Sequence, residues 1–125
     1  MICLDVKVRQ AMIDNQELAS LVGECIWQVG EPVTNTNYPR IGFEEVSNVP
    51  SGHADDDEIM TAITYRFLVY ANEDSVLNKI LSIVENVFKR MGFMRRDLGK
   101  LYSLPDGIVG KELLMLINLE DDING

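Results

Sequence analysis

The chain is poor in the residues that carry metal-site and nucleophilic chemistry. It has one histidine, His53, and two cysteines, Cys3 and Cys25. No CxxC motif or Cys/His spacing typical of zinc sites is present, so we expect two free thiols, as in a reducing cytoplasm. The single histidine would have to serve any Ser/His or Cys/His pair, and no P-loop, GxGxxG or GxSxG motif occurs. These absences predict a protein that is not an enzyme and holds neither a metal nor a cofactor.

Basic residues and long apolar runs are also scarce. The chain has 11 Lys and Arg against 20 Asp and Glu, a net charge of −9. This charge disfavours gripping nucleic acid or an anionic membrane, although an acidic channel lining would let a duplex slide through. No apolar run approaches the roughly 20 residues that a membrane span needs. The N-terminal stretch lacks a basic region before a long apolar core. We therefore expect a soluble protein without signal peptide or membrane span.

What the chain does contain fits one globular domain over residues 1–125. Its 125 residues are 46% apolar and 25% charged, which is ordinary for a folded domain. Apolar spacing predicts a helix over residues 4–22, broken at Asp14-Asn15, and a stronger helix over residues 72–92. Asp74 or Ser75 is the expected cap of the second helix, and Gly92 its expected end.

Alternating apolar residues predict the strands. The expected strands cover residues 25–29, 40–50, 58–71, 93–107 with a turn at 105–107, and 108–120. The expected loops cover residues 30–39 and 50–57. The sequence therefore predicts an α+β fold: an antiparallel or mixed sheet of about four to five strands with the N-terminal and central helices packed on it.

The strand at 58–71 has two different faces. Ile63, Tyr65 and Phe67 lie on the face expected to meet the helices. Met60, Arg66, Leu68 and Tyr70 lie on the other face, which mixes apolar and polar side chains. The final strand is likewise apolar on both faces, with Leu114 and Leu116 on the second. A helix or a neighbouring subunit must cover this surface, which makes self-assembly a hypothesis from the residues alone.

Two charged clusters are candidate sites. His53 precedes three acidic residues, Asp55, Asp56 and Asp57. Adjacent carboxylates in an extended segment alternate sides and lack the spacing of a calcium loop, so we interpret them as a solvated loop that repels neighbouring strand edges. For the pair Arg95-Arg96, contact with DNA phosphate, an ion pair within the chain and an ion pair between subunits all remain open.

The order and spacing of several segments resemble a known family. These segments are "LASLVG", "YPRIGFEEV", "ITYRFLVYAN", "SVLNKILSIVENVFKRMGF" running directly into "MRRD", and "YSLPDGIVGKELLMLINLE". Together they resemble the small tail-completion or tail-terminator proteins of tailed bacteriophages, which stand at the junction of head and tail. The acidic stretch "SGHADDD" departs from the family's average loop.

The resemblance implies a non-enzymatic structural protein that forms a ring, usually a hexamer. The ring would cap the tail tube, end its polymerisation and present a docking surface to the head or neck. The implied partners are other copies of the chain, the tail-tube protein and a neck or connector protein, while DNA passes through without specific binding. The implied location is the tail or neck of a virion assembled in a bacterial cytoplasm.

On this view, two sets of residues are expected to make contacts. Subunit contacts are expected at Met60, Arg66, Leu68, Tyr70, Arg95 and Arg96. Contacts with tube or neck are expected at Asn35, Asn37, Tyr38, His53, Asp55, Asp56 and Asp57.

Two alternatives stay open at this point. The protein could be a neck or connector ring that bridges portal and tail. Such a ring is distinguished from a tail terminator by whether it binds tube protein or portal-side protein. It could also be a ferredoxin-like module that binds a small molecule, which requires an apolar pocket with a few convergent polar groups.

Overall fold

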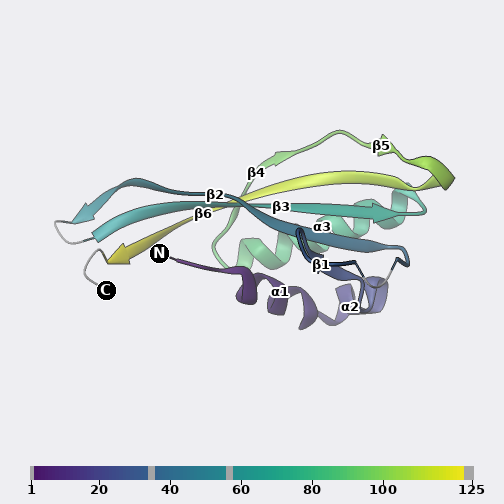
Figure 1. The fold of residues 1–125 in the computed structure, drawn as a ribbon, viewed down its shortest axis with the longest axis horizontal. Helices are drawn as coiled ribbons and strands as arrows, with labels where there is room; N and C mark the ends of the chain where they lie inside the picture. Colours follow the sequence, from purple (N-terminus) through teal and green to yellow (C-terminus); the bar gives the residue numbers. More distant parts are fainter. Residues whose placement is uncertain (1, 34–35, 56–57, 123–125) are drawn as a thin grey trace.

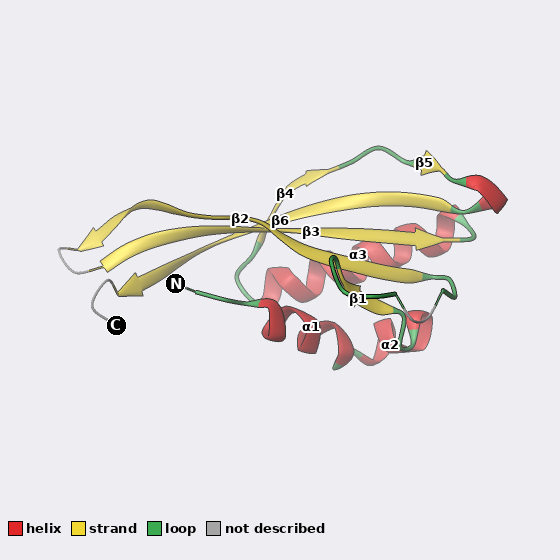
Figure 2. Cartoon of the chain, viewed as in Figure 1, coloured by secondary structure: helices red, strands yellow, loops and turns green. Residues whose placement is uncertain are grey.

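A computed structural model describes residues 2–33, 36–55 and 58–122 of the chain (Figure 1). Within these residues the elements in chain order are α1 (Asp5–Ile13), α2 (Gln16–Val22), β1 (Ile26–Gln28), β2 (Arg40–Asp55), β3 (Glu58–Ala71), α3 (Asp74–Arg90), β4 (Met94–Leu98), β5 (Tyr102–Ser103), a short 3₁₀ helix (Pro105–Gly107) and β6 (Val109–Asp122). The three α-helices lie on one side of a mixed sheet (Figure 2). The expected α+β fold is confirmed, with six strands rather than four to five.

The sheet has the strand order β1-β2-β3-β6-β4, and β5 also pairs with β6. β1 is parallel to β2, and the other pairings are antiparallel. Three strands continue past the helices as an arm, made of residues 49–55, 58–62 and 118–122 (Figure 1). One face of the sheet carries no helix, and we call it the helix-free face.

The core lies between β3 and α3. Tyr65 and Phe67 of β3 are fully buried, as is Phe88 of α3. The Phe67 ring stacks on Phe88 with centroids 4.6 Å apart, and Phe93 meets Phe88 edge-on at 5.4 Å. Burying large aromatic side chains removes much apolar area from water, which holds α3 against the sheet. The predicted inward face of residues 58–71 is therefore confirmed for Ile63, Tyr65 and Phe67.

The helix boundaries follow local signals, with one exception. Asn15 separates α1 from α2, and its Oδ1 accepts a hydrogen bond from the Leu18 backbone N–H at 2.8 Å, as an N-cap does. α3 ends at Arg90, and Gly92 follows with a φ of 100°, as expected of a helix terminator. The expected cap at Asp74 or Ser75 is wrong, because α3 starts one residue earlier, after Glu73, which makes no side-chain capping bond.

The expected loop over residues 50–57 is also wrong where the structure describes it. β2 runs on to Asp55, so His53 and Asp55 have strand backbone, while Asp56 and Asp57 lie outside the described residues. The pairing of β2 with β3 shifts register at three places, including between Pro50 and Gly52. Such bulges admit an extra residue without ending the ladder, so turn-forming residues here bend the strand instead of stopping it.

The expected strand over residues 93–107 is divided. The structure forms β4 and β5 as separate short strands along β6, joined by residues 99–101, before the 3₁₀ turn at Pro105–Gly107.

Candidate interaction surfaces

An aromatic row crosses one end of the helix-free face. The rings of Trp27 and Tyr70 stack with centroids 6.2 Å apart, and Tyr102 meets Tyr70 edge-on at 6.3 Å. The Arg40 guanidinium lies 4.4 Å from the Tyr38 ring centroid and 5.5 Å from that of Trp27. Arg40 also donates to the Tyr38 hydroxyl at 2.6 Å. Stacking and cation–π contacts thus hold these half-buried side chains against one another, and we call the set the aromatic platform.

Two glycines let this platform lie flat on the sheet. A Cβ on Gly42 would stand 2.5 Å from the Trp27 ring, and one on Gly110 would stand 2.7 Å from the Tyr102 ring. Both distances are shorter than the non-bonded contacts that Cβ atoms make in proteins. The absence of a side chain at these two positions is therefore what allows the rings to cover the backbone.

The middle of the helix-free face carries an ion-pair cluster. Arg66 Nη1 lies 2.9 Å from Glu44 Oε1, and Arg66 Nε lies 3.7 Å from Glu112 Oε2. The Arg66 side chain is 34% exposed, so these pairs are screened and add modestly to stability. Their effect is to neutralise the guanidinium within the chain.

The residues expected to make subunit contacts are only partly brought together. Met60, Arg66, Leu68 and Tyr70 share the helix-free face and are half-buried. The two arginines of β4 diverge, however. Arg95 faces α3, where its Nη1 lies 3.3 Å from Glu85 Oε1. Arg96 reaches back across the sheet and donates to Thr64 Oγ1 at 3.4 Å.

The residues expected to contact tube or neck lie at opposite ends of β2. Asn37 and Tyr38 precede its first residue, whereas His53 and Asp55 lie at its far end, in the arm (Figure 1). Sixteen residues of strand separate the ends by roughly 50 Å. One small binding patch therefore does not include both groups. Asn35, Asp56 and Asp57 lie outside the described residues.

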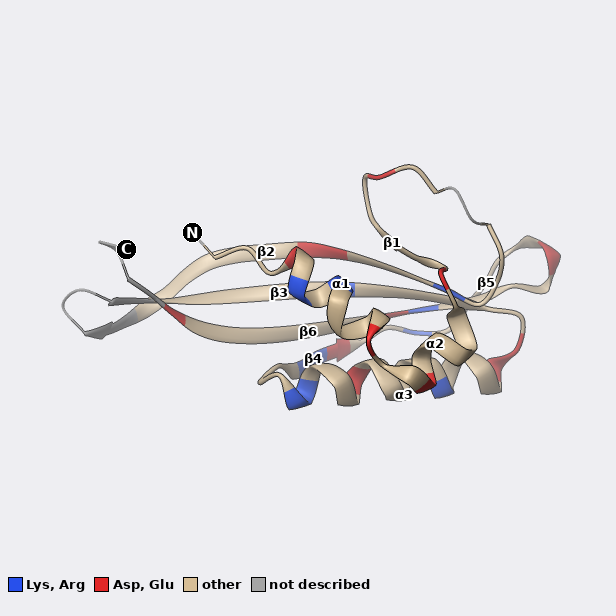
Figure 3. Ribbon diagram, turned by 90° about the horizontal axis from the view of Figure 1, so that it is seen from below, with Lys and Arg blue, Asp and Glu red and all other residues tan. Residues whose placement is uncertain are grey.

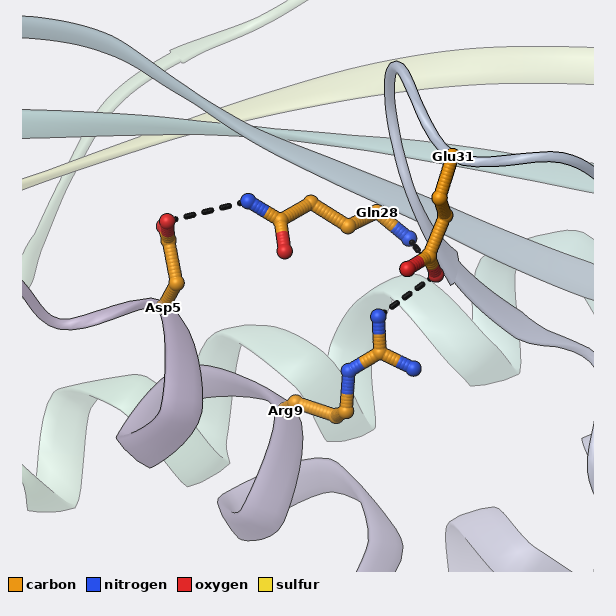
Figure 4. A network of polar contacts seen from close by, with 4 residues as sticks. All are labelled: Asp5, Arg9, Gln28 and Glu31. Carbon is orange, nitrogen blue, oxygen red and sulfur yellow. Dashed lines mark hydrogen bonds and ion pairs between the residues drawn. The ribbon is translucent and has the colours of Figure 1, made fainter.

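A polar network that the sequence pattern did not indicate ties α1 to the sheet (Figure 4). Asp5 accepts hydrogen bonds from the Tyr65 hydroxyl and from Gln28 Nε2, the latter at 2.9 Å. Glu31 accepts from the Gln28 backbone N–H at 2.7 Å and from the Arg9 guanidinium. The partners are up to 60 residues apart, so no local spacing signals the contact.

This network and its surroundings perturb two acid–base groups. Burial raises the pKa of Tyr65 well above its usual range, and the hydrogen bond to the Asp5 carboxylate adds to the effect. The pKa of Glu31 is lowered, first by the Gln28 backbone N–H and then by the Arg9 side chain. Both shifts favour the protonation states that hold the network together at neutral pH.

The remaining candidate sites in the described residues concern metal ligands, a groove and two thiols. None of their His, Cys, Asp and Glu side chains form a group of three or more placed to hold a metal ion. An open groove of about 410 Å³ lies between α1 and β1, lined in part by Arg9, Cys25, Trp27 and Glu31. Cys25 is buried and Cys3 exposed, and both are free thiols. No helix in the described part of the chain is long and apolar enough to cross a membrane.

Comparison with known proteins gives a match in fold. No protein-family model and no curated protein matches the chain. Among solved structures, a chain in the virion of a native gene transfer agent particle superposes with a TM-score of 0.70. The match covers 91% of this chain and 92% of that chain at 11% sequence identity. At that identity the likeness establishes the fold alone: this chain is similar in fold, over nearly its whole length, to a chain of a virion.

Proposed function

We propose that the protein is a non-enzymatic structural component of a phage-like virion, and that it forms the ring that caps the tail tube at the head–tail junction. The observation that carries the proposal is the fold match to a virion chain, which extends over 91% of this chain and 92% of that chain. The resemblance of the sequence segments to tail-terminator proteins points in the same direction from different information.

The layout of the surfaces fits such a role. A cap needs one surface for the tube, a second for the neck and a third for neighbouring copies. The molecule offers groups that are far apart: the segment before β2 at one end, the arm at the other, and the sheet edges between them (Figure 1). Strand ends and edges are suitable for covering the open edges of a polymer by adding backbone hydrogen bonds.

The charge of the chain fits passage of DNA rather than binding. A net charge of −9 repels phosphate, so a ring of such subunits would not hold a duplex in its channel. Of the two arginines considered for phosphate contact, Arg95 and Arg96, the first is paired with the Glu85 carboxylate of the same chain at 3.3 Å, which weakens its attraction for phosphate.

Binding experiments with three ligands separate the proposal from its alternatives. The purified protein is mixed in turn with tail-tube protein and with portal-side connector protein encoded alongside it, and is screened against small molecules by thermal shift. A tail terminator binds the tube protein. A neck or connector ring binds the portal-side protein instead, and a small-molecule module shows a ligand-dependent melting temperature. Failure to bind tube protein contradicts the capping role.

A further inference from the structure

Several strand edges in the described part of the sheet have no strand partner, and the two longest belong to β2 and β4. β4 pairs with β6 on one side only. β2 pairs with β1 from Ile41 to Phe43, and from Glu44 onward its outer edge is open. Open edges present unpaired backbone N–H and C=O groups, which are templates for another strand. Many proteins protect such edges, so their length and side chains determine whether they pair.

The two open edges match in direction. β2, β3, β6 and β4 are successive antiparallel neighbours, so β4 runs opposite to β2. If β4 of one copy lies beside β2 of the next, the antiparallel ladder continues without a break. An isologous contact, β2 with β2 or β4 with β4, would leave the other edge of each copy open.

The edges also match in length. On β2 the open segment runs from Glu44 to the residue before Pro50, which has no N–H to donate and limits pairing beyond it. That segment, residues 44–49, has the length of β4 plus one residue. Both segments contain one register shift in their pairing inside the chain, between Glu45 and Ser47 in β2 and between Arg95 and Asp97 in β4.

Apolar side chains are exposed on both edges. Val46 and Val49 of the β2 segment are 44% and 50% exposed. Met94 and Leu98 of β4 are 59% and 37% exposed. Cross-strand pairs of apolar side chains stabilise the association of two strands. Each edge has two exposed apolar side chains that are available for such pairs with a neighbouring strand.

The charges of the two edges are opposite in sign. The β2 segment contains Glu44 and Glu45 and no cation, whereas β4 contains Arg95, Arg96 and a single carboxylate, Asp97. Figure 3 shows the acidic stretch of β2 and the basic residues of β4 along opposite edges of the sheet. Glu44 is paired with Arg66 and Arg95 with Glu85 inside the chain, so the charge complementarity available between copies is that of Glu45 with Arg96.

From these matches in direction, length and charge we propose that copies of this chain associate head to tail, with β4 of one copy pairing antiparallel with residues 44–49 of β2 in the next. Such a heterologous contact generates a ring when its rotation closes. The inference rests on the proposed ring for its biological purpose, but it concerns which two surfaces meet.

Blocking each edge separately tests the proposal. The double variant Val46→Lys/Val49→Lys blocks β2, and Met94→Lys/Leu98→Lys blocks β4, because lysines on an edge strand oppose pairing. Val6→Lys/Ile13→Lys is the control, since it places the same charges on exposed apolar positions of α1. Mass by light scattering is measured across a concentration series. We expect the wild type and the control to form oligomers and each edge variant to be a monomer.

Mixing the two edge variants gives the sharper result. Each retains one intact edge of a different kind, so an equimolar mixture should form a complex of two copies and nothing larger. Persistent association of either edge variant, a mixture that stays monomeric, or a wild type that is monomeric at every concentration would overturn the proposal. Circular dichroism melting verifies folding, and Met94→Lys alone replaces the β4 variant if Leu98→Lys lowers stability.

The outcome is separable from that of the proposed function. Rings that form despite blocked edges and still bind tube protein would reject the edge pairing and leave the capping role standing. Rings that depend on both edges but ignore tube protein would support the pairing and reject the capping role.

Discussion

The closeness of aromatic rings to the sheet depends on single glycines. Gly42→Ala would place a Cβ 2.5 Å from the Trp27 ring, so we expect a loss of about 1–3 kcal/mol in the free energy of unfolding. Gly99→Ala is the matched control, because its Cβ would make an ordinary contact of 3.5 Å with the Glu112 carbonyl, and we expect a change within about 0.5 kcal/mol. Urea unfolding measures both. Equal stability of the two variants would contradict the account of the aromatic platform.

Two tyrosines with raised pKa values, Tyr65 and Tyr102, predict a loss of stability at alkaline pH. The pKa of Tyr65 is raised in the folded protein, by burial and by Asp5, and that of Tyr102 is raised by burial and by Tyr70. In the unfolded chain tyrosine ionises near pH 10. A raised folded pKa gives stability that is fully present below about pH 10 and is lost as the pH rises further.

Tyr65→Phe tests this linkage. At neutral pH the variant should lose about 1–3 kcal/mol, because the Asp5 carboxylate loses a hydrogen-bond donor. Above about pH 10 its stability should fall less steeply than that of the wild type. Urea unfolding at a series of pH values measures both effects. Parallel curves for the two proteins would show that Tyr65 is not the group responsible.

At the scale of elements, the sequence predicts features that neighbouring residues determine, such as the buried face of a strand and the break between two helices. The alternation along residues 58–71 identifies the inward face of β3, and Asn15 marks the break between α1 and α2, because both depend on neighbours in sequence. The far end of β2 is different. Pro50 and Gly52 are typical of a loop, but β3 offers a backbone partner that local pattern does not reveal.

The candidate surfaces were predictable only in part for the same reason. Alternation placed Met60, Arg66 and Leu68 on one face correctly. Alternation also places the adjacent Arg95 and Arg96 on opposite faces, but it does not indicate their partners, Glu85 and Thr64, which lie on other elements. Which strands form the edges of the sheet is a property of strand order, and no local spacing encodes it.

The packing of α3 on the sheet predicts a large effect from one substitution. Phe88→Ala removes the ring that contacts both Phe67 and Phe93, and we expect a loss of about 3–5 kcal/mol in the free energy of unfolding. Met91→Ala, just beyond the helix and 38% exposed, should cost less than about 1 kcal/mol. Thermal or urea unfolding compares them. Similar costs would contradict the assignment of Phe88 to the core.

At the scale of the whole molecule, function is proposed to lie in assembly. A core of aromatic and aliphatic side chains holds one face of the sheet against the helices, and the other face, the edges and the arm remain available to partners. If the proposed role is right, the protein acts through the surfaces that it covers in a larger structure, and its activity has to be measured in the presence of the proposed partners.

The most direct test of the capping role is the length of tail tubes assembled with and without the protein. Purified tube protein is polymerised alone and with increasing amounts of this chain, and lengths and ends are recorded by negative-stain electron microscopy. The account predicts shorter tubes as the protein increases, with a ring at one end of each. Unchanged lengths and bare ends, under conditions where the protein is folded, would contradict it.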